Sequence, residues 1–240
     1  MTTPQNGPAE SLPADIFPAD IFPDDALDIR WVVPAQFHSL GVELPEQERE
    51  AHLAEVAAEI WCGGTEFQRS TVASWYSDIA ATAGEEGAVY SGFLLAGTED
   101  DRVTVATLVI QADQADTADA DTVAAAIQDM LSLDPANEVF RVPAPVGPVV
   151  VAVAGSLAEV DDEFGNKAKL ELAQASAYIP VPGADTLVTM TISTPMLIDF
   201  PEYVTMLAGL VETVVYDRPG TQPATALPGP DRAKITEAFG

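Results

Sequence analysis

The stretch YIPVPGADTLVTMTISTPMLIDFPEYVTMLAGLVETV, residues 178–214, determines the fold more than any other part of the chain. Apolar residues alternate on both sides of the turn residues at 182–185, which predicts two long antiparallel strands over 169–181 and 187–194. Residues 199–202 (DFPE) have the capping-box spacing with a proline in the first turn, which predicts a helix running through Tyr216. Its residues available for burial are Tyr203, Val204, Leu207, Leu210, Val211, Val214 and Val215.

A meander is expected upstream of this stretch. Residues 89–96 and 103–112 are strand-like and flank a polar turn at 98–101. The second of these segments is apolar on both faces, with Val105 and Val109 on one and Leu108 and Ile110 on the other, which favours a central strand. Further strands are expected at 29–33, 42–44, 138–142 and 149–154, with a hairpin tip at 161–166.

Helical periodicity predicts three more helices, at 46–61, 65–83 and 121–131. Their expected inward residues are Leu53, Val56, Ala57, Ile60 and Trp61 in the first, Val72, Trp75, Tyr76, Ile79, Ala80 and Ala83 in the second, and Val123, Ile127, Met130 and Leu131 in the third. The predicted fold class is α+β, one curved antiparallel sheet covered by helices. We expect a common core of Trp31, Trp75, Leu108, Val151, Ile179, Met190 and Leu207.

The strand opening on Trp31, the meander and the closing stretch Tyr178–Val215 resemble the Mog1/PsbP-like fold of DUF1795-type proteins. The resemblance is one of layout over about residues 29–216. The chain is also similar to actinobacterial proteins encoded beside type VII secretion genes. What the resemblance implies is a non-enzymatic adaptor, chaperone or assembly factor. The helical pair at 46–83 is longer than that layout predicts.

Charge narrows the possible partners. The chain has 38 Asp and Glu against 10 Lys and Arg, a formal net charge of −28. Such a field repels phosphate, so nucleic acid and anionic membranes are disfavoured and a protein with a basic surface is the expected partner. The acidity is equally explained by a role in solubility, or by an acidic amino-acid composition that is general in the source lineage. A single cysteine, Cys62, excludes an internal disulfide, and the start has no secretory pattern, so we expect a cytoplasmic protein without membrane insertion.

The two ends differ from the middle in composition. Residues 1–27 contain the direct repeat PADIF-PADIF, and prolines at this spacing prevent a regular helix or a central strand. We therefore expect a disordered tail at 1–27, a single α+β domain at 28–217 and a flexible tail at 218–240. An alternative for the first tail is a short linear motif whose partner-binding anchors are Ile16, Phe17, Ile21 and Phe22.

The sequence gives little support for a catalytic residue or a secretion motif. Trp61-Cys62-Gly63 has the W-x-G form of small type VII secretion substrates. The secretion tag that goes with it, a tyrosine with an acidic residue four positions later, is not found at any tyrosine of this sequence. The alternative is a core tryptophan followed by glycines that stop the helix. We expect His38 to be a loop residue, His52 to lie on a solvated acidic face and Cys62 to be an inert core thiol. No catalytic residue or cofactor is predicted.

Two carboxylate-rich segments, 113–121 and 161–166, offer oxygens to a hard cation. Neither has the glycine and terminal glutamate of an EF-hand loop, so helix-capping and solvated aspartates are the expected use. The predicted function is a non-catalytic protein-interaction factor. The alternatives are a structural or cargo-type component of an assembly, and an enzyme with a site that the sequence does not reveal.

Overall fold

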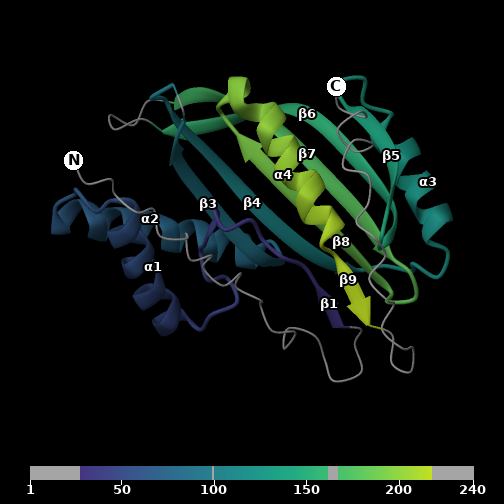
Figure 1. Ribbon diagram of the computed structural model, residues 1–240, viewed down its shortest axis with the longest axis horizontal. Helices are drawn as coiled ribbons and strands as arrows, with labels where there is room; N and C mark the ends of the chain where they lie inside the picture. The colour runs from purple at the N-terminus through teal and green to yellow at the C-terminus, as the bar shows by residue number, and fades with distance from the viewer. Residues whose placement is uncertain (1–27, 99, 162–166, 218–240) are drawn as a thin grey trace, which may run out of the picture.

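The computed structural model describes residues 28–98, 100–161 and 167–217. Its central feature is a seven-stranded antiparallel sheet in the order β2-β3-β4-β8-β7-β6-β5 (Figure 1). The strands are β2 (His38–Ser39), β3 (Ala88–Gly97), β4 (Val103–Gln114), β5 (Glu138–Ala144), β6 (Gly147–Asp161), β7 (Lys167–Val181) and β8 (Thr186–Thr194). With four α-helices in the described ranges, this confirms the predicted α+β class.

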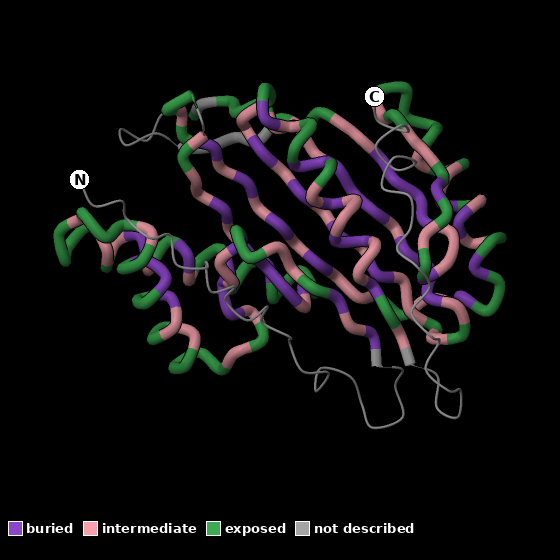
Figure 2. The backbone as a smooth tube through the Cα atoms, viewed as in Figure 1, coloured by how far each residue is buried: buried purple, intermediate pink, exposed green. Residues whose placement is uncertain are grey.

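The strand register explains why the middle of the sheet forms the core. Ile110 of β4 lies opposite Met190 of β8, which lies opposite Ala177 of β7, and none of the three is accessible to solvent. Successive strand residues point to opposite faces, so buried and half-buried residues alternate along these strands (Figure 2). The prediction that residues 103–112 form a central strand is confirmed, because β4 pairs on both edges.

One face of the sheet is covered by α4 (Phe200–Glu212), which follows a 3₁₀ turn at Leu197–Asp199 and contacts β7 and β8 (Figure 1). The helix buries Tyr203, Leu207 and Leu210 against the sheet. Two short strands, β1 (Asp28–Arg30) and β9 (Val215–Asp217), pair with each other and add Ile29 to the same core.

The opposite face has helices at its two ends. Val149 and Val151 belong to the core under α4, whereas Val150 packs against Ala124 and Ile127 of α3 (Ala120–Leu131), so α3 lies on the other face. The hairpin of α1 (Glu46–Ile60) and α2 (Glu66–Glu85) packs on β3 of this face. Between them the strand register aligns a hydroxyl-rich row: Thr107, Ser176, Thr189, Thr191 and Ser193.

Several predicted boundaries were wrong. The last helix ends at Glu212, and Val215–Asp217 leaves it to pair with β1, because consecutive β-branched residues lose side-chain freedom in a helix and suit a strand. Residues 42–44 form a turn rather than a strand, and the strand before α1 is His38–Ser39. Met130, expected inside, is 61% exposed.

Three predictions fall on residues outside the described ranges. These are the tails at 1–27 and 218–240, the anchors Ile16, Phe17, Ile21 and Phe22, and the hairpin tip at 162–166. Among the described residues, Asp161 of β6 pairs with Lys167 of β7, and the two strands are antiparallel.

Candidate protein-interaction surface

The start of α2 is fixed by a capping box that the sequence analysis did not identify. The Gln68 N–H donates to Thr65 Oγ1 at 3.3 Å, and the Thr65 N–H donates to Gln68 Oε1 at 2.9 Å. These two bonds satisfy N–H groups that a helix start leaves without partners. The cap gives α2 a defined first turn, which contains the exposed residue Phe67.

The α1–α2 hairpin has its own apolar cluster. Leu53, Val56 and Ala57 of α1 meet Val72, Tyr76 and Ala80 of α2, with Leu40 beneath them. The Tyr76 ring packs on Phe93 of β3 with ring centroids 5.3 Å apart, which attaches the hairpin to the sheet. Burial raises the pKa of Tyr76, and a side-chain hydrogen bond with Trp61 partly opposes that rise.

One flank of α2 remains uncovered. Phe67 is 79% exposed, Trp75 61% and Ile79 44%, and Thr71 lies half-buried between the first two. We call Phe67, Thr71, Trp75 and Ile79 the α2 stripe. The prediction that Trp75 and Ile79 point inward was wrong, because α1 and β3 cover only the arc of α2 that contains Val72, Tyr76, Ala80 and Ala83.

The connection between α1 and α2 is also open. Trp61 is 43% exposed and Cys62 is exposed, so the predictions of a core tryptophan and a core thiol were wrong. The helix stop itself is confirmed, because α1 ends at Ile60 and the chain turns through Gly63 and Gly64. A side-chain hydrogen bond joins Trp61 to Tyr76 of α2, although Trp61 itself is exposed.

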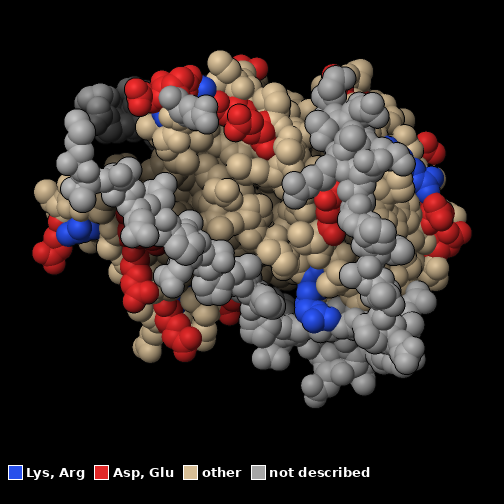
Figure 3. Space-filling view, viewed as in Figure 1, with Lys and Arg blue, Asp and Glu red and all other residues tan. Residues whose placement is uncertain are grey.

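The hairpin is strongly acidic. Residues 46–85 contain eight carboxylates and only two basic residues, Arg49 and Arg69. Figure 3 shows red side chains over α1 and α2 at the left of the molecule. The α2 stripe is therefore an apolar surface within an anionic one.

Both histidines join this hairpin to the sheet edge. His52 Nε2 donates to the Ser39 carbonyl at 2.8 Å, and His38 Nδ1 lies 3.8 Å from Glu59 Oε2. The expectation that His52 lies on a solvated face was wrong, because it lies against β2 and bonds to its backbone. His38 belongs to β2 rather than to a loop. Each histidine thus connects α1 with β2.

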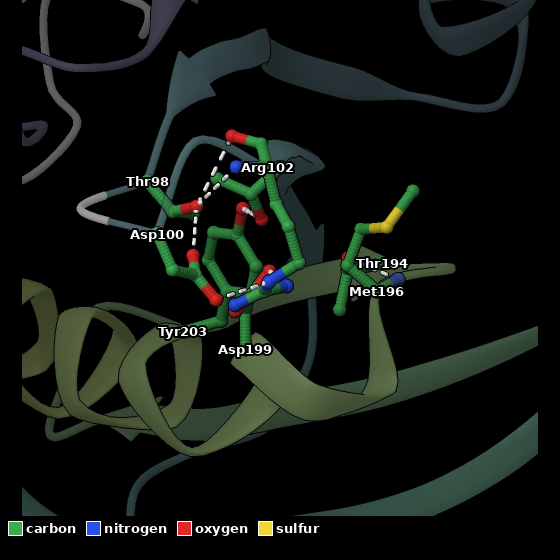
Figure 4. Close-up of polar contacts among 8 residues, drawn as sticks. Thr98, Asp100, Arg102, Thr194, Met196, Asp199 and Tyr203 are labelled. Atoms are coloured by element: carbon green, nitrogen blue, oxygen red, sulfur yellow. Dashed lines mark hydrogen bonds and ion pairs between the residues drawn. The ribbon is translucent and has the colours of Figure 1, made fainter.

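A polar cluster lies where the β3–β4 turn meets the start of α4 (Figure 4). Arg102 donates to Asp199 through Nη1 at 3.2 Å and Nη2 at 2.9 Å, and through Nε to Asp100 at 2.7 Å. Thr98 Oγ1 donates to Asp100 at 2.5 Å. Beside them, the hydroxyls of Thr104 and Tyr203 are 2.6 Å apart and buried.

The sequence analysis missed the role of Arg102 and misassigned that of Asp199. Asp199 precedes α4 as predicted, but its side chain makes no capping bond, because Arg102 binds both of its oxygens. Every nitrogen of the guanidinium donates to a carboxylate of the cluster, which engages three of its five N–H groups. The arrangement fastens α4 to the β3–β4 turn.

We expect this cluster to make stability depend on pH in a defined direction. Hydrogen bonds from Arg102, and a smaller contribution from Thr104, hold the pKa of Asp199 below its usual value, and bonds from Arg102 and Thr98 lower the pKa of Asp100 to about 2. An unfolded aspartate has a pKa of about 3.9. Because the folded values are lower, the stabilisation is present above about pH 4 and is lost as the pH falls toward 2.

The measurement is denaturant unfolding of the wild type and of Asp199→Asn between about pH 6 and pH 2.5. The stability difference between them should be constant above about pH 5 and shrink below about pH 4. Asp129→Asn is the control, since Asp129 is exposed on α3. A difference that stays constant or grows into acid would show that the Asp199 carboxylate does not stabilise the fold through its charge.

The carboxylates of residues 113–121 are used locally. Asp119 begins α3 by accepting the Thr122 N–H at 3.1 Å, and Asp116 accepts the Ala118 N–H at 3.1 Å. Asp121 forms an ion pair with Arg141 of β5. Among the described residues, no group of three or more His, Cys, Asp or Glu side chains could hold a metal ion. The second segment, 161–166, lies almost wholly outside the described ranges.

Comparisons with protein-family models, with curated proteins and with solved structures found no match to this chain. The Mog1/PsbP-like resemblance therefore stays a prediction from layout. Within the ranges that the structure describes, no helix is long and apolar enough to cross a membrane.

Proposed function

We propose that the protein is a non-catalytic interaction factor, acting in the cytoplasm, that binds a protein with a basic surface. The observation that supports this most is the α2 stripe, whose members Phe67, Trp75 and Ile79 are all more than two-fifths exposed within an acidic hairpin. Large aromatic side chains in a polar surround are the usual composition of the energetic centre of an interface.

The stripe is not required by the fold, which strengthens the proposal. The same helix already buries Val72, Tyr76, Ala80 and Ala83, so α2 is attached to the domain without its stripe. Leaving two aromatic rings and an isoleucine in water brings the monomer no benefit, whereas covering them with a partner releases their hydration. We infer that a partner covers them.

The charge favours one kind of partner. The net charge of −28 would repel phosphate backbones and anionic lipids, and would attract a basic protein surface. The exposed free thiol of Cys62 is suited to a reducing compartment, which is why we place this activity in the cytoplasm. The acidic surface speeds encounter with the partner and the apolar stripe provides affinity.

The test is capture of a stoichiometric partner by the full chain from extract of its source cell, followed by native mass spectrometry. A chain lacking residues 1–27 should retain that partner, because the α2 stripe belongs to the folded domain. Loss of the partner with an unchanged melting temperature would instead place the contact on Ile16, Phe17, Ile21 and Phe22. Absence of any stoichiometric partner would contradict the proposed function.

A further inference from the structure

We propose that the α2 stripe is the docking ridge for an amphipathic α-helix of the partner, with lysines or arginines along the flanks of that helix. The inference rests on the proposed function and names the element that the partner presents. Phe67, Thr71, Trp75 and Ile79 follow one another at intervals of four residues. Such an i±4n row is the ridge that packs into the groove of a second helix.

The dimensions of the ridge suit a helix of ordinary length. Phe67 and Ile79 are twelve positions apart, which corresponds to about 18 Å along the axis of α2. Each step of four residues turns by about 40°, so the row drifts slowly around the helix and crosses a partner helix at an angle. The two rings and the isoleucine would be knobs between the side chains of the facing helix.

Charge determines the flanks of the partner helix. Asp78 is three residues after Trp75 and therefore lies beside it on the same side of α2, and Glu85 and Glu86 follow at the end of the helix. The last turn of α2 contains no basic residue, so its negative dipole end is uncompensated. Arg69 lies about 120° around the axis from Trp75, away from the ridge.

The other possible occupants fit less well. A second copy of the chain would place one acidic α2 surface against another, between two molecules that each have a net charge of −28. The segment around Ile16 and Phe17 is itself acidic. The C-terminal residues 218–240 contain Arg232 and Lys234 near Ile235, so they are tested directly below.

The experiment uses two synthetic 18-residue peptides of identical leucine, lysine and alanine composition. One places leucine on a single helical face with lysines beside it, and the other has the same residues in an order that breaks this face. Fluorescence anisotropy of the labelled peptides with the full chain should give at least tenfold tighter binding for the amphipathic peptide. Trp75→Ala should weaken that binding at least tenfold.

Leu133→Ala is the matched control, because Leu133 is 82% exposed beside Asp134 but lies outside the stripe. It should leave the affinity unchanged, and melting curves should be equal for both variants. Equal binding of the two peptides, or equal binding by wild type and Trp75→Ala, would overturn the inference.

Two further measurements test whether the C-terminal segment or a second copy of the chain occupies the stripe instead. If deletion of residues 218–240 raises the affinity for the amphipathic peptide at least tenfold, the ridge belongs to the C-terminal segment of the chain itself and the inference is overturned. A dimer in sedimentation that Trp75→Ala dissolves would likewise assign the ridge to a second copy. If a captured cellular partner still binds Trp75→Ala, the inference fails while the proposed function stands.

Discussion

Replacing Leu207 by alanine should lower the free energy of unfolding by about 2–5 kcal/mol. Leu207 is 2% exposed and lies on the face of α4 that packs against β7 and β8. The substitution removes buried methyl groups and leaves a cavity that the strands beneath cannot readily fill, because they are paired on both sides. For a domain of this size the melting temperature should fall by about 4–20 °C.

The matched control for this substitution is Leu133→Ala, which removes the same atoms from a residue that is 82% exposed. Its melting temperature should stay close to that of the wild type, since exposed substitutions usually change stability by less than about 0.5 kcal/mol. Equal melting temperatures for the two variants would show that α4 does not cover the sheet as described. Thermal melts followed by circular dichroism are sufficient.

The central sheet was predictable because its signals are local. β7 and β8 have period-two alternation, β4 is apolar on both faces, and the turn at 182–185 between β7 and β8 contains the expected polar, proline and glycine residues. Six of the seven predicted core residues, among them Leu108, Met190 and Leu207, are buried as expected. The strands β2 and β9 were missed because two or three residues are too few to show a period.

The α2 stripe was not predicted, for a reason that concerns packing. An apolar arc of α2 extends from Trp75 to Ala80, and the sequence alone does not state how much of it a neighbour covers. In the structure α1 and β3 cover Tyr76 and Ala80 and leave Trp75 and Ile79 in solvent. An apolar arc wider than the helix needs for packing is the signal that could have revealed the stripe.

The polar cluster was missed because its contacts are distant in sequence. Asp199 begins a helix in a capping-box pattern, which is a local signal, yet its partner Arg102 is 97 residues away. The pattern predicted the place of the helix start correctly and the role of the carboxylate wrongly. The local sequence pattern thus located the start of α4, whereas the ion pair with Arg102 determines what the Asp199 side chain binds.

Association with the partner should be strongly salt-dependent in its rate. The Debye length falls from about 10 Å at 0.1 M to about 3 Å at 1 M ionic strength, so the field of the acidic hairpin reaches an approaching protein only at low salt. Steering of this kind raises association rates roughly 10- to 1,000-fold, and most of that gain should be lost at about 1 M salt. Surface plasmon resonance with a captured partner measures the association rate at each salt concentration.

The acidic residues and the α2 stripe should affect different rate constants of binding. Asp78→Asn combined with Glu85→Gln and Glu86→Gln removes charge beside the stripe and should flatten the salt dependence of the association rate. Trp75→Ala should leave that rate nearly unchanged and raise the dissociation rate, because apolar contacts act after encounter. An association rate that is the same at low and high salt would indicate that the acidity serves solubility alone, and only the stripe would then support a binding role.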